Sequence, residues 1–219
     1  MIYPAVRDYF NELSISFESI PRERKLLLEK ISQYILNKQL LHAPANLVYI
    51  CTHNSRRSHF AQVWCRIAAD YYGIESIFSY SGGTEATAFH ANALAALKRT
   101  GLQVHQLTAE ISNPQYEVRH GDTESASICF SKRYDDRINP QKDFAAIMTC
   151  GEAEENCPFI PGAELRIGTT YVDPKAFDKT VQQDLEYDAS CRQIAMETLY
   201  VFYFCRQNRQ ETNHGYDSK

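Results

Sequence analysis

The fold is decided by residues 46–58, which read NLVYI followed by CTHNSRRS. The first five residues are a short apolar, β-branched run, and such a run predicts a buried strand. From Arg57 onward the pattern is helical, and one face carries Phe60, Val63, Trp64, Ile67 and Ala68. Residues 51–58 are therefore expected to form a loop between a buried strand and a helix.

Further strands are predicted at residues 76–80, 144–149 and 163–172, and further helices at residues 88–99 and 182–206. A turn is expected at Gly82-Gly83-Thr84, and Gly101 is a natural end for the first of these helices. Strands that alternate with helices predict an α/β fold with an open, mostly parallel sheet. Ligands bind such sheets beyond the carboxyl ends of the strands, where Cys51 and Cys150 are expected to lie.

Three segments flank or interrupt this pattern. Residues 1–45 are expected to be helical, with Ser19 as a cap and Pro21 in the first turn of a helix. Residues 113–131 predict an inserted β-hairpin, with strands at 116–118 and 126–130 and a turn at 120–122. Residues 207–219 are polar and are expected to form a frayed tail, so the catalytic domain is predicted to span 46–206.

The composition is that of a globular protein. The chain has 219 residues, of which 44% are hydrophobic and 23% charged, and its net charge of -4 argues against a nucleic-acid or anionic-membrane partner. The longest apolar run, residues 199–205, is too short to cross a bilayer. The first ten residues lack the pattern of a signal peptide. Seven cysteines without a secretion signal predict free thiols in a cytoplasmic protein.

The loop at Cys51 has the spacing of an oxyanion site. A loop of this kind points backbone N–H groups at a tetrahedral anion, and the positive end of the following helix adds to the field. Both effects favour the thiolate form of Cys51 as a nucleophile. Arg57 supplies a fork for two oxygens, Ser58 can donate to the sulfur, and Asn54 tolerates a left-handed backbone. The other expected oxyanion-binding residues are Thr52, His53, Ser55 and Arg56. The alternative is a buried, inert cysteine at a strand end.

A second group of residues depends on this loop for its interpretation. Asp173, followed by Pro174, is a candidate general acid, although such a pair is often only a turn. Cys150 and Cys157 flank a polar stretch, which favours thiol exchange over a structural bridge. Zinc is the alternative, but the spacing fits no common zinc pattern. The remaining cysteines are expected in the core, namely Cys65, Cys129, Cys191 and Cys205.

At these residues the sequence resembles the low-molecular-weight protein tyrosine phosphatases, and most of all their thioredoxin-coupled arsenate reductase branch. The resemblance covers about residues 47–206. Its motifs are the loop 51–58, then Ser81-Gly82-Gly83-Thr84, Cys150, Cys157-Pro158 and Asp173-Pro174. It implies a four-stranded parallel sheet with helices on both faces.

The resemblance also implies a mechanism. Cys51 corresponds to the nucleophile, Arg57 to the oxyanion clamp, Ser58 to the thiolate stabiliser and Asp173 to the general acid. In a reductase, Cys51 would attack arsenate. Cys150 would then attack Cys51 and release arsenite, and Cys157 would form a disulfide with Cys150 that thioredoxin reduces.

The chain departs from the reductase pattern in two places. The reductases usually carry a cysteine at the position of Arg56 and a glutamate at the position of Gln62, and in some members that glutamate helps to hold a potassium ion. We therefore expect no metal and no cofactor. Residues 1–45 and 113–131 have no counterpart in the minimal family fold, so they are candidates for a partner surface or a homodimer interface.

Three functions remain open from the sequence. The first is a thiol-dependent arsenate reductase with a thioredoxin-like reductant. The second is a phosphatase acting on a phosphomonoester through a phosphocysteine, for which Tyr171 and Phe177 are candidate walls around an aromatic substrate. The third is an oxyanion-binding or redox-sensing module without turnover.

Overall fold

The computed structural model describes residues 1–157 and 159–214, with side chains described up to residue 209. The α-helices are α1 (Pro4–Ile15), α2 (Arg22–Leu40), α3 (Arg57–Tyr72), α4 (Ala91–Arg99), α5 (Gly151–Asn156) and α6 (Gln183–His214). The strands are β1 (Ala45–Cys51), β2 (Ile77–Gly83), β3 (Gln103–Gln106), β4 (Tyr116–Arg119), β5 (Ser127–Cys129), β6 (Phe144–Met148) and β7 (Ala163–Gly168). Two short 3-10 helices, η1 (Phe17–Ser19) and η2 (Pro174–Phe177), complete the elements.

The main sheet confirms the predicted α/β architecture. It has four strands in the order β2-β1-β6-β7, and all three pairings are parallel. Strand β1 is central, and its residues are buried on both faces except for Asn46. This burial explains the unbroken apolar run in the sequence, because a central parallel strand is covered from both sides.

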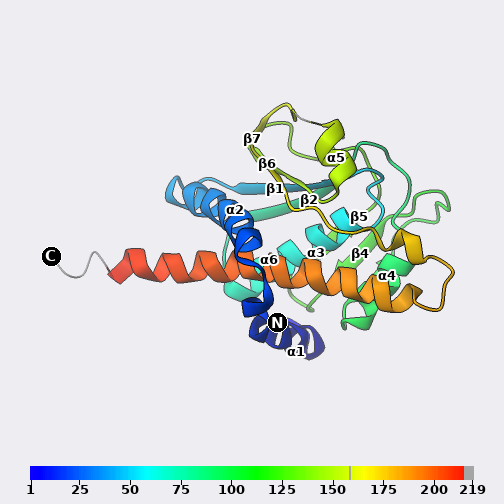
Figure 1. The fold of residues 1–219 in the computed structure, drawn as a ribbon, viewed down its shortest axis with the longest axis horizontal. Helices are drawn as coiled ribbons and strands as arrows, with labels where there is room; N and C mark the ends of the chain where they lie inside the picture. The colour runs from blue at the N-terminus through cyan, green and yellow to red at the C-terminus, as the bar shows by residue number, and fades with distance from the viewer. Residues whose placement is uncertain (158, 215–219) are drawn as a thin grey trace.

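The helices cover the two faces of this sheet unequally. Helices α3, α6 and α2 lie on one face, and the short α5 lies on the other (Figure 1). The larger core is built around Trp64 of α3 and Phe202 of α6, both fully buried. The smaller core, under α5, contains Ile50, Met148 and Cys150. The thiols of Cys51 and Cys150 both belong to this smaller core, at the carboxyl ends of β1 and β6.

The first forty residues are helical, as predicted, and they form part of the larger core. In α1 the side chains of Val6, Phe10 and Leu13 are fully buried, and Phe10 lies 5.5 Å from the ring of Trp64. Burial of each such side chain contributes about 1.5–3 kcal/mol of stability. The predicted Ser19 cap is wrong, because α2 begins after Pro21 without a side-chain cap and the Ser19 hydroxyl donates to the Ser16 carbonyl.

The inserted hairpin is confirmed and is larger than predicted. Strands β4 and β5 pair antiparallel, and β3 adds a third strand on the other side of β4. The sequence did not indicate β3 because its four residues, QVHQ, are mostly polar and exposed and show no apolar alternation. Tyr116 of this sheet packs edge-on against Phe89, at a ring distance of 6.1 Å, so the insert adjoins the segment that leads into α4.

Three boundaries differ from the prediction. Gly82 and Gly83 are the last residues of β2 and do not form a turn. Helix α4 begins at Ala91, with His90 as its cap, and not near residue 88. Helix α6 runs to His214, so residues 207–214 of the predicted tail are helical, while residues 215–219 and Pro158 lie outside the described residues. Within the described ranges, no helix is long and apolar enough to cross a membrane.

Candidate active site

The loop 51–58 lies at the carboxyl end of β1, and its carbonyl groups face outward. The Cys51 and Thr52 carbonyls accept from the amides of Thr84 and Glu85, at 3.1 and 2.8 Å. The His53 carbonyl accepts from two hydroxyls, those of Thr87 and Ser131, each at 3.0 Å. These carbonyls are thus turned to surrounding segments, which suits a loop whose N–H groups face an anion. Anion binding by the loop stays a prediction.

A chain of hydrogen bonds runs from the outside of the loop to the Cys51 sulfur. The Lys132 amide donates to Asn54 Oδ1, and Asn54 Nδ2 donates to Ser58 Oγ, each at 2.8 Å. Ser58 Oγ then lies 3.1 Å from Cys51 Sγ. Asn54 has a φ of 44°, the left-handed conformation expected for it. The Ser58 hydroxyl, whose oxygen already accepts from Asn54, is thus placed within hydrogen-bond distance of the sulfur, to which it can donate its own proton.

The two glycines before Thr84 allow other backbone segments to approach closely. A Cβ atom on Gly83 would lie 2.7 Å from the Thr52 carbonyl and from the Asn54 nitrogen. A Cβ atom on Gly82 would likewise lie too close to the backbone of Tyr134. A larger residue at position 83 would push the loop out of place, which explains these glycines at the end of the strand.

Arg57 and Asp173 form an ion pair beside Cys51. Arg57 Nη2 donates to Asp173 Oδ2 at 2.6 Å, and Nη1 donates to the Tyr171 carbonyl at 2.9 Å. Among the described residues, the buried Arg57 Nε has no hydrogen-bond partner. A buried N–H without an acceptor is rare, and an oxyanion in the loop would satisfy it.

The Arg56 side chain lies beside this pair, with its Nε 3.9 Å from Asp173 Oδ1, but its hydrogen bonds go to other residues. Its Nε donates to the Tyr187 hydroxyl at 2.7 Å and its Nη2 to Asp178 at 3.2 Å. Burial disfavours the charge of Asp178, but the hydrogen bond from Tyr187 and the charges of His90 and Arg56 outweigh it and lower the Asp178 pKa. These hydrogen bonds engage the side-chain nitrogens of Arg56, although the residue also lines the hollow above Cys51. The side chain ties the loop to residues 173–178 and to α6.

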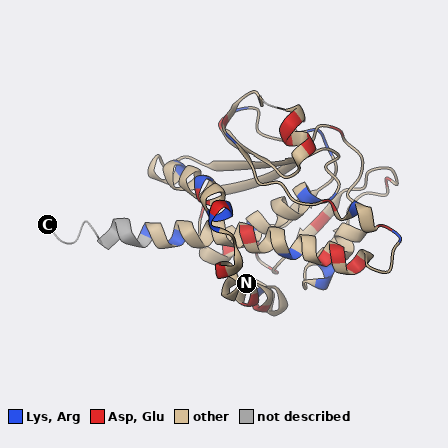
Figure 2. Cartoon of the chain, viewed as in Figure 1, with Lys and Arg blue, Asp and Glu red and all other residues tan. Residues whose placement is uncertain are grey.

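Cys150 and Cys157 lie at opposite ends of α5. Cys150 is the N-cap residue, and its sulfur accepts from the Ala153 amide at 3.4 Å. The same sulfur is 3.4 Å from the Thr52 hydroxyl, in the residue next to Cys51. Cys157 is the C-cap residue and is half-buried. Three glutamates, Glu152, Glu154 and Glu155, make this helix acidic (Figure 2).

The structure therefore gathers most of the predicted site residues. One hollow is lined by six of them: Cys51, His53, Ser55, Arg56, Arg57 and Asp173. Asn54 and Ser58 support it from behind, and Thr52 connects it to Cys150. Cys157 stands apart at the far end of α5. Sequence reasoning missed Ser131 and Lys132, which hold the loop from a distant segment and carry no motif of their own.

Two further expectations can be compared with the structure. Tyr171 is wrong as a wall for an aromatic substrate, because it is buried and its ring lies beneath the Arg24 guanidinium at 4.8 Å. Phe177 is half-buried. The four cysteines assigned to the core are buried, as predicted, and burial raises the pKa of each thiol to about 12: Cys65, Cys129, Cys191 and Cys205.

Comparison with known proteins points to one family. The sequence model described as "Low molecular weight phosphotyrosine protein phosphatase" matches residues 46–145. An arsenate reductase of Staphylococcus epidermidis is 26% identical over 129 residues, which cover 58% of this chain and 77% of the relative. The arsenate reductase of Bacillus licheniformis is 25% identical over 138 residues, covering 63% and 79%. The chain is similar over these residues to the low-molecular-weight protein tyrosine phosphatases and to the arsenate reductases among them.

The predicted resemblance is thus confirmed, and it includes the arsenate reductase branch of the superfamily. Among solved structures, the arsenate reductase of Archaeoglobus fulgidus is matched at 14% identity and a TM-score of 0.46, over 71% of this chain and 98% of that one. Members of this superfamily are enzymes with a cysteine nucleophile, and this chain is an enzyme of that kind. A binding module without turnover, the third function left open by the sequence, does not fit an enzyme of this kind. The family match ends before Cys150, so Cys150, Cys157 and Asp173 lie beyond it.

Proposed function

We propose that the chain is a thiol-dependent arsenate reductase, with Cys51 as the nucleophile and Cys150 and Cys157 as the relay. The observation that carries the proposal is the position of Cys150, whose sulfur contacts Thr52 beside the nucleophile. Strands β1 and β6 are paired in register, and the Thr149 amide donates to the Ile50 carbonyl at 2.7 Å. The two thiols therefore lie at the ends of adjacent strands, and neighbouring parallel strands are only about 4.8 Å apart.

The reaction begins at the loop. The Cys51 thiolate attacks the arsenic atom of arsenate, and an arsenate oxygen leaves as water after accepting protons, one of them from Asp173. Arg57 and the loop amides hold the remaining oxygens. The product of this step is a covalent Cys51–arsenic adduct that still contains arsenic in its +5 state.

The relay then supplies two electrons. The Cys150 thiolate attacks Cys51 Sγ, the sulfur–arsenic bond breaks, and its electron pair remains on arsenic, which leaves as arsenite. A Cys51–Cys150 disulfide results. The Cys157 thiolate attacks Cys150 Sγ, which frees the Cys51 thiolate and forms a Cys150–Cys157 disulfide. A dithiol reductant of the thioredoxin type finally reduces this bond.

The last disulfide requires α5 to unwind. The seven steps from Cys150 to Cys157 span roughly 10 Å along a helix that rises 1.5 Å per residue. The Cα atoms of a disulfide are less than about 7 Å apart, so the two cysteines cannot join while α5 is intact. A helix of six residues is marginal by itself, so its unwinding breaks few backbone hydrogen bonds. It also requires the release of Arg166, which donates to the carbonyls of Glu154 and Cys157.

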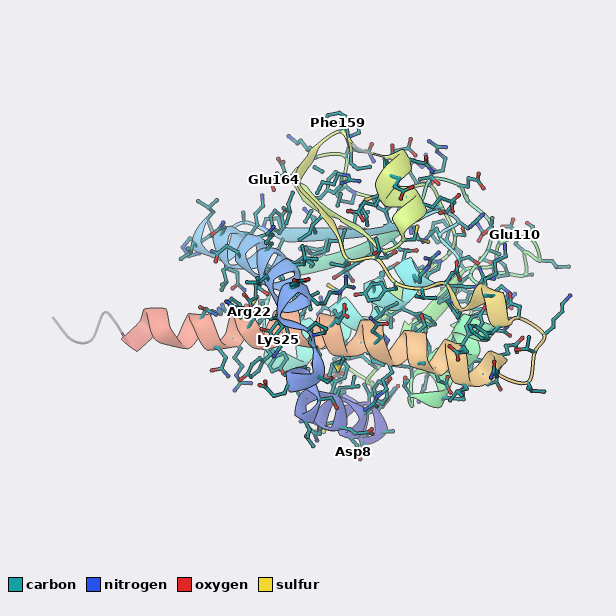
Figure 3. All side chains as sticks on the ribbon, in the orientation of Figure 1. Asp8, Arg22, Lys25, Glu110, Phe159 and Glu164 are labelled. Carbon is teal, nitrogen blue, oxygen red and sulfur yellow. The ribbon has the colours of Figure 1, made fainter. Side chains whose placement is uncertain are left out.

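The surface around Cys157 suits a protein reductant. Phe159 is 76% exposed. It lies on the outer rim of the molecule, on the side opposite α6 (Figure 3). An exposed aromatic side chain two residues from a half-buried thiol offers an apolar contact for a partner that must reach that thiol.

A phosphatase is the second candidate, because Cys51, Arg57 and Asp173 would also serve phosphoryl transfer. An oxyanion or phosphate substrate is consistent with the family. In a phosphatase, water would attack the phosphocysteine before a second thiol could reach it. The burial of Tyr171 removes one of the two expected aromatic walls, while Cys150 has no role in such a reaction.

The variants Cys150→Ser and Cys157→Ser test the proposal. We expect each to lower thioredoxin-dependent arsenite release by at least about 100-fold, because a serine cannot accept the disulfide bond. Asn156→Ser, a change in the same helix that removes no thiol, serves as the control. Unchanged arsenite release in both cysteine variants would sink the reductase proposal. Trapping of a phosphocysteine in Asp173→Ala would then favour the phosphatase.

A further inference from the structure

A second pocket is lined by residues of the edge strands β2 and β5 and of the segments next to them. Figure 1 shows where these two strands lie. Its volume is about 450 Å³, within the range of small-molecule sites. Apolar side chains form much of its wall, and three of them are exposed to solvent: Phe78, Ile128 and Ile138. The pocket shares no lining residue with the hollow above Cys51.

Lys132 provides a cation in this pocket. Its side chain lines the pocket, yet the residue is only 4% exposed. Within the described part of the chain, no carboxylate oxygen lies within 4.0 Å of the Lys132 ammonium, the limit for an ion pair. Asp136 acts on the charge of Lys132 only from farther away. The ammonium instead stands over the ring of Phe130, at 4.7 Å from its centre.

An ammonium group in such a place is costly. Burial lowers the pKa of Lys132, because it disfavours the charged form. Proteins usually pair a buried charge with an opposite charge or leave it in water. Arg66, on the wall of the same pocket, follows this rule through its ion pair with Asp70. Lys132 is therefore the cation in this pocket that has no ion pair among the described residues, and an anion in the pocket would supply its counter-charge.

We propose that this pocket binds a small carboxylate with an aromatic or aliphatic body. The carboxylate would pair with Lys132, and the body would cover Phe78 and Ile138. One unpaired cation in a largely apolar pocket matches a single negative charge better than the two charges of a phosphate group. This inference does not depend on the reaction that Cys51 performs.

The pocket adjoins the catalytic loop through Lys132 itself. The Lys132 amide holds Asn54, and the Lys132 carbonyl accepts from the Gly83 amide at 2.9 Å. A ligand paired with the Lys132 side chain would thus contact the residue whose backbone fixes the loop. Substitution of the side chain leaves both backbone bonds in place, so Lys132 can be replaced without removing this support.

The test titrates the full chain with 4-phenylbutyrate as the probe and follows the backbone amide chemical shifts by NMR. Saturating inorganic phosphate is present throughout. We expect saturable shifts around residues 77–80 and 126–132. Binding should weaken at least tenfold with 4-phenylbutyramide, which lacks the charge, and at least tenfold in Lys132→Met. Lys142→Met, a change at an exposed lysine, is the control and should bind as the unchanged protein does.

A second variant covers the case in which Lys132→Met fails to fold. Ile138→Glu places a carboxylate on an exposed edge of the pocket and should weaken probe binding about fivefold or more through repulsion. Cys51→Ser should leave binding unchanged. The proposal is overturned if Lys132→Met or Ile138→Glu, when folded, binds the probe as tightly as the unchanged protein. It is also overturned if the amide binds as well as the acid, if no saturable binding occurs, or if the shifts map to residues 51–58.

Discussion

The loop 51–58 and the segment 150–157 each carry a cysteine of the proposed reaction, and they are built in opposite ways. The loop is fixed from outside by residues 84–87 and 131–132, which bond its carbonyls and Asn54. The segment is a single helix of six residues with a cysteine at each end, and its outside support comes from Arg166, which donates to the carbonyls of Glu154 and Cys157. An anion site must be rigid before the substrate arrives, whereas a thiol that moves needs a segment that unwinds at small cost.

The largest effect should follow from removing the nucleophile in the rigid region. Cys51→Ser is expected to lower turnover by at least about 1,000-fold, because the reaction has no other route. Phosphate binding should stay within about threefold, since Arg57 and the loop amides are unchanged. Steady-state kinetics and calorimetric titration with phosphate measure the two quantities. Turnover above a tenth of that of the unchanged protein would contradict the role of Cys51.

Two matched glycine changes compare the packing of the two regions. Gly83→Ala should lower the free energy of unfolding by about 3 kcal/mol, because the new Cβ would meet the loop backbone at 2.7 Å. Gly151→Ala, at the start of α5, has no atom within 4 Å of its new Cβ and should not destabilise the protein. Denaturant unfolding of both variants checks this. Equal destabilisation would show that the two regions are packed alike.

The pH dependence of stability also reports on the rigid region, through His59. His59, next to the loop and fully buried, has a pKa well below its usual 6.5, because burial and the charge of Lys132 disfavour its protonation. The unfolded chain binds this proton below about pH 6.5 and the folded chain does not. The free energy of unfolding therefore decreases as the pH is lowered below about 6.5, by up to about 1.4 kcal/mol per pH unit.

His59→Gln should remove this contribution and flatten the fall in stability between pH 6.5 and 5. Unfolding free energies at several pH values measure the slope. His105→Gln, at an exposed position, is the control and should keep the slope of the unchanged protein. Parallel slopes in all three proteins would mean that His59 does not remain neutral in the folded state.

The smallest effect concerns the movement of α5. Alanine favours a helix over glycine by about 0.5–1 kcal/mol, so Gly151→Ala should make α5 harder to unwind. The transfer of the disulfide from Cys51–Cys150 to Cys150–Cys157 should slow by about two- to fivefold. Single-turnover quenching followed by mass spectrometry measures this step. An unchanged or faster transfer would argue that α5 does not unwind in the relay.

Much of this site could be predicted from local pattern. The strand that ends at Cys51 and the helix that begins at Arg57 follow from an apolar run and a helical spacing, and the chemistry of the loop follows from its residue types. The orientation of Arg56 could not be predicted, because it depends on Asp178 and Tyr187, which are more than a hundred residues away. The same holds for Lys132, whose role comes from its burial and not from a motif.

The most direct test of the account is to incubate the fully reduced protein with arsenate and to map its disulfides by mass spectrometry. We predict a Cys150–Cys157 disulfide that forms only with arsenate and is absent from Cys51→Ser. In Cys157→Ser, a Cys51–Cys150 disulfide should accumulate instead. If no disulfide forms in the presence of arsenate, or if the same bond forms without Cys51, the relay does not exist and the proposed function is wrong.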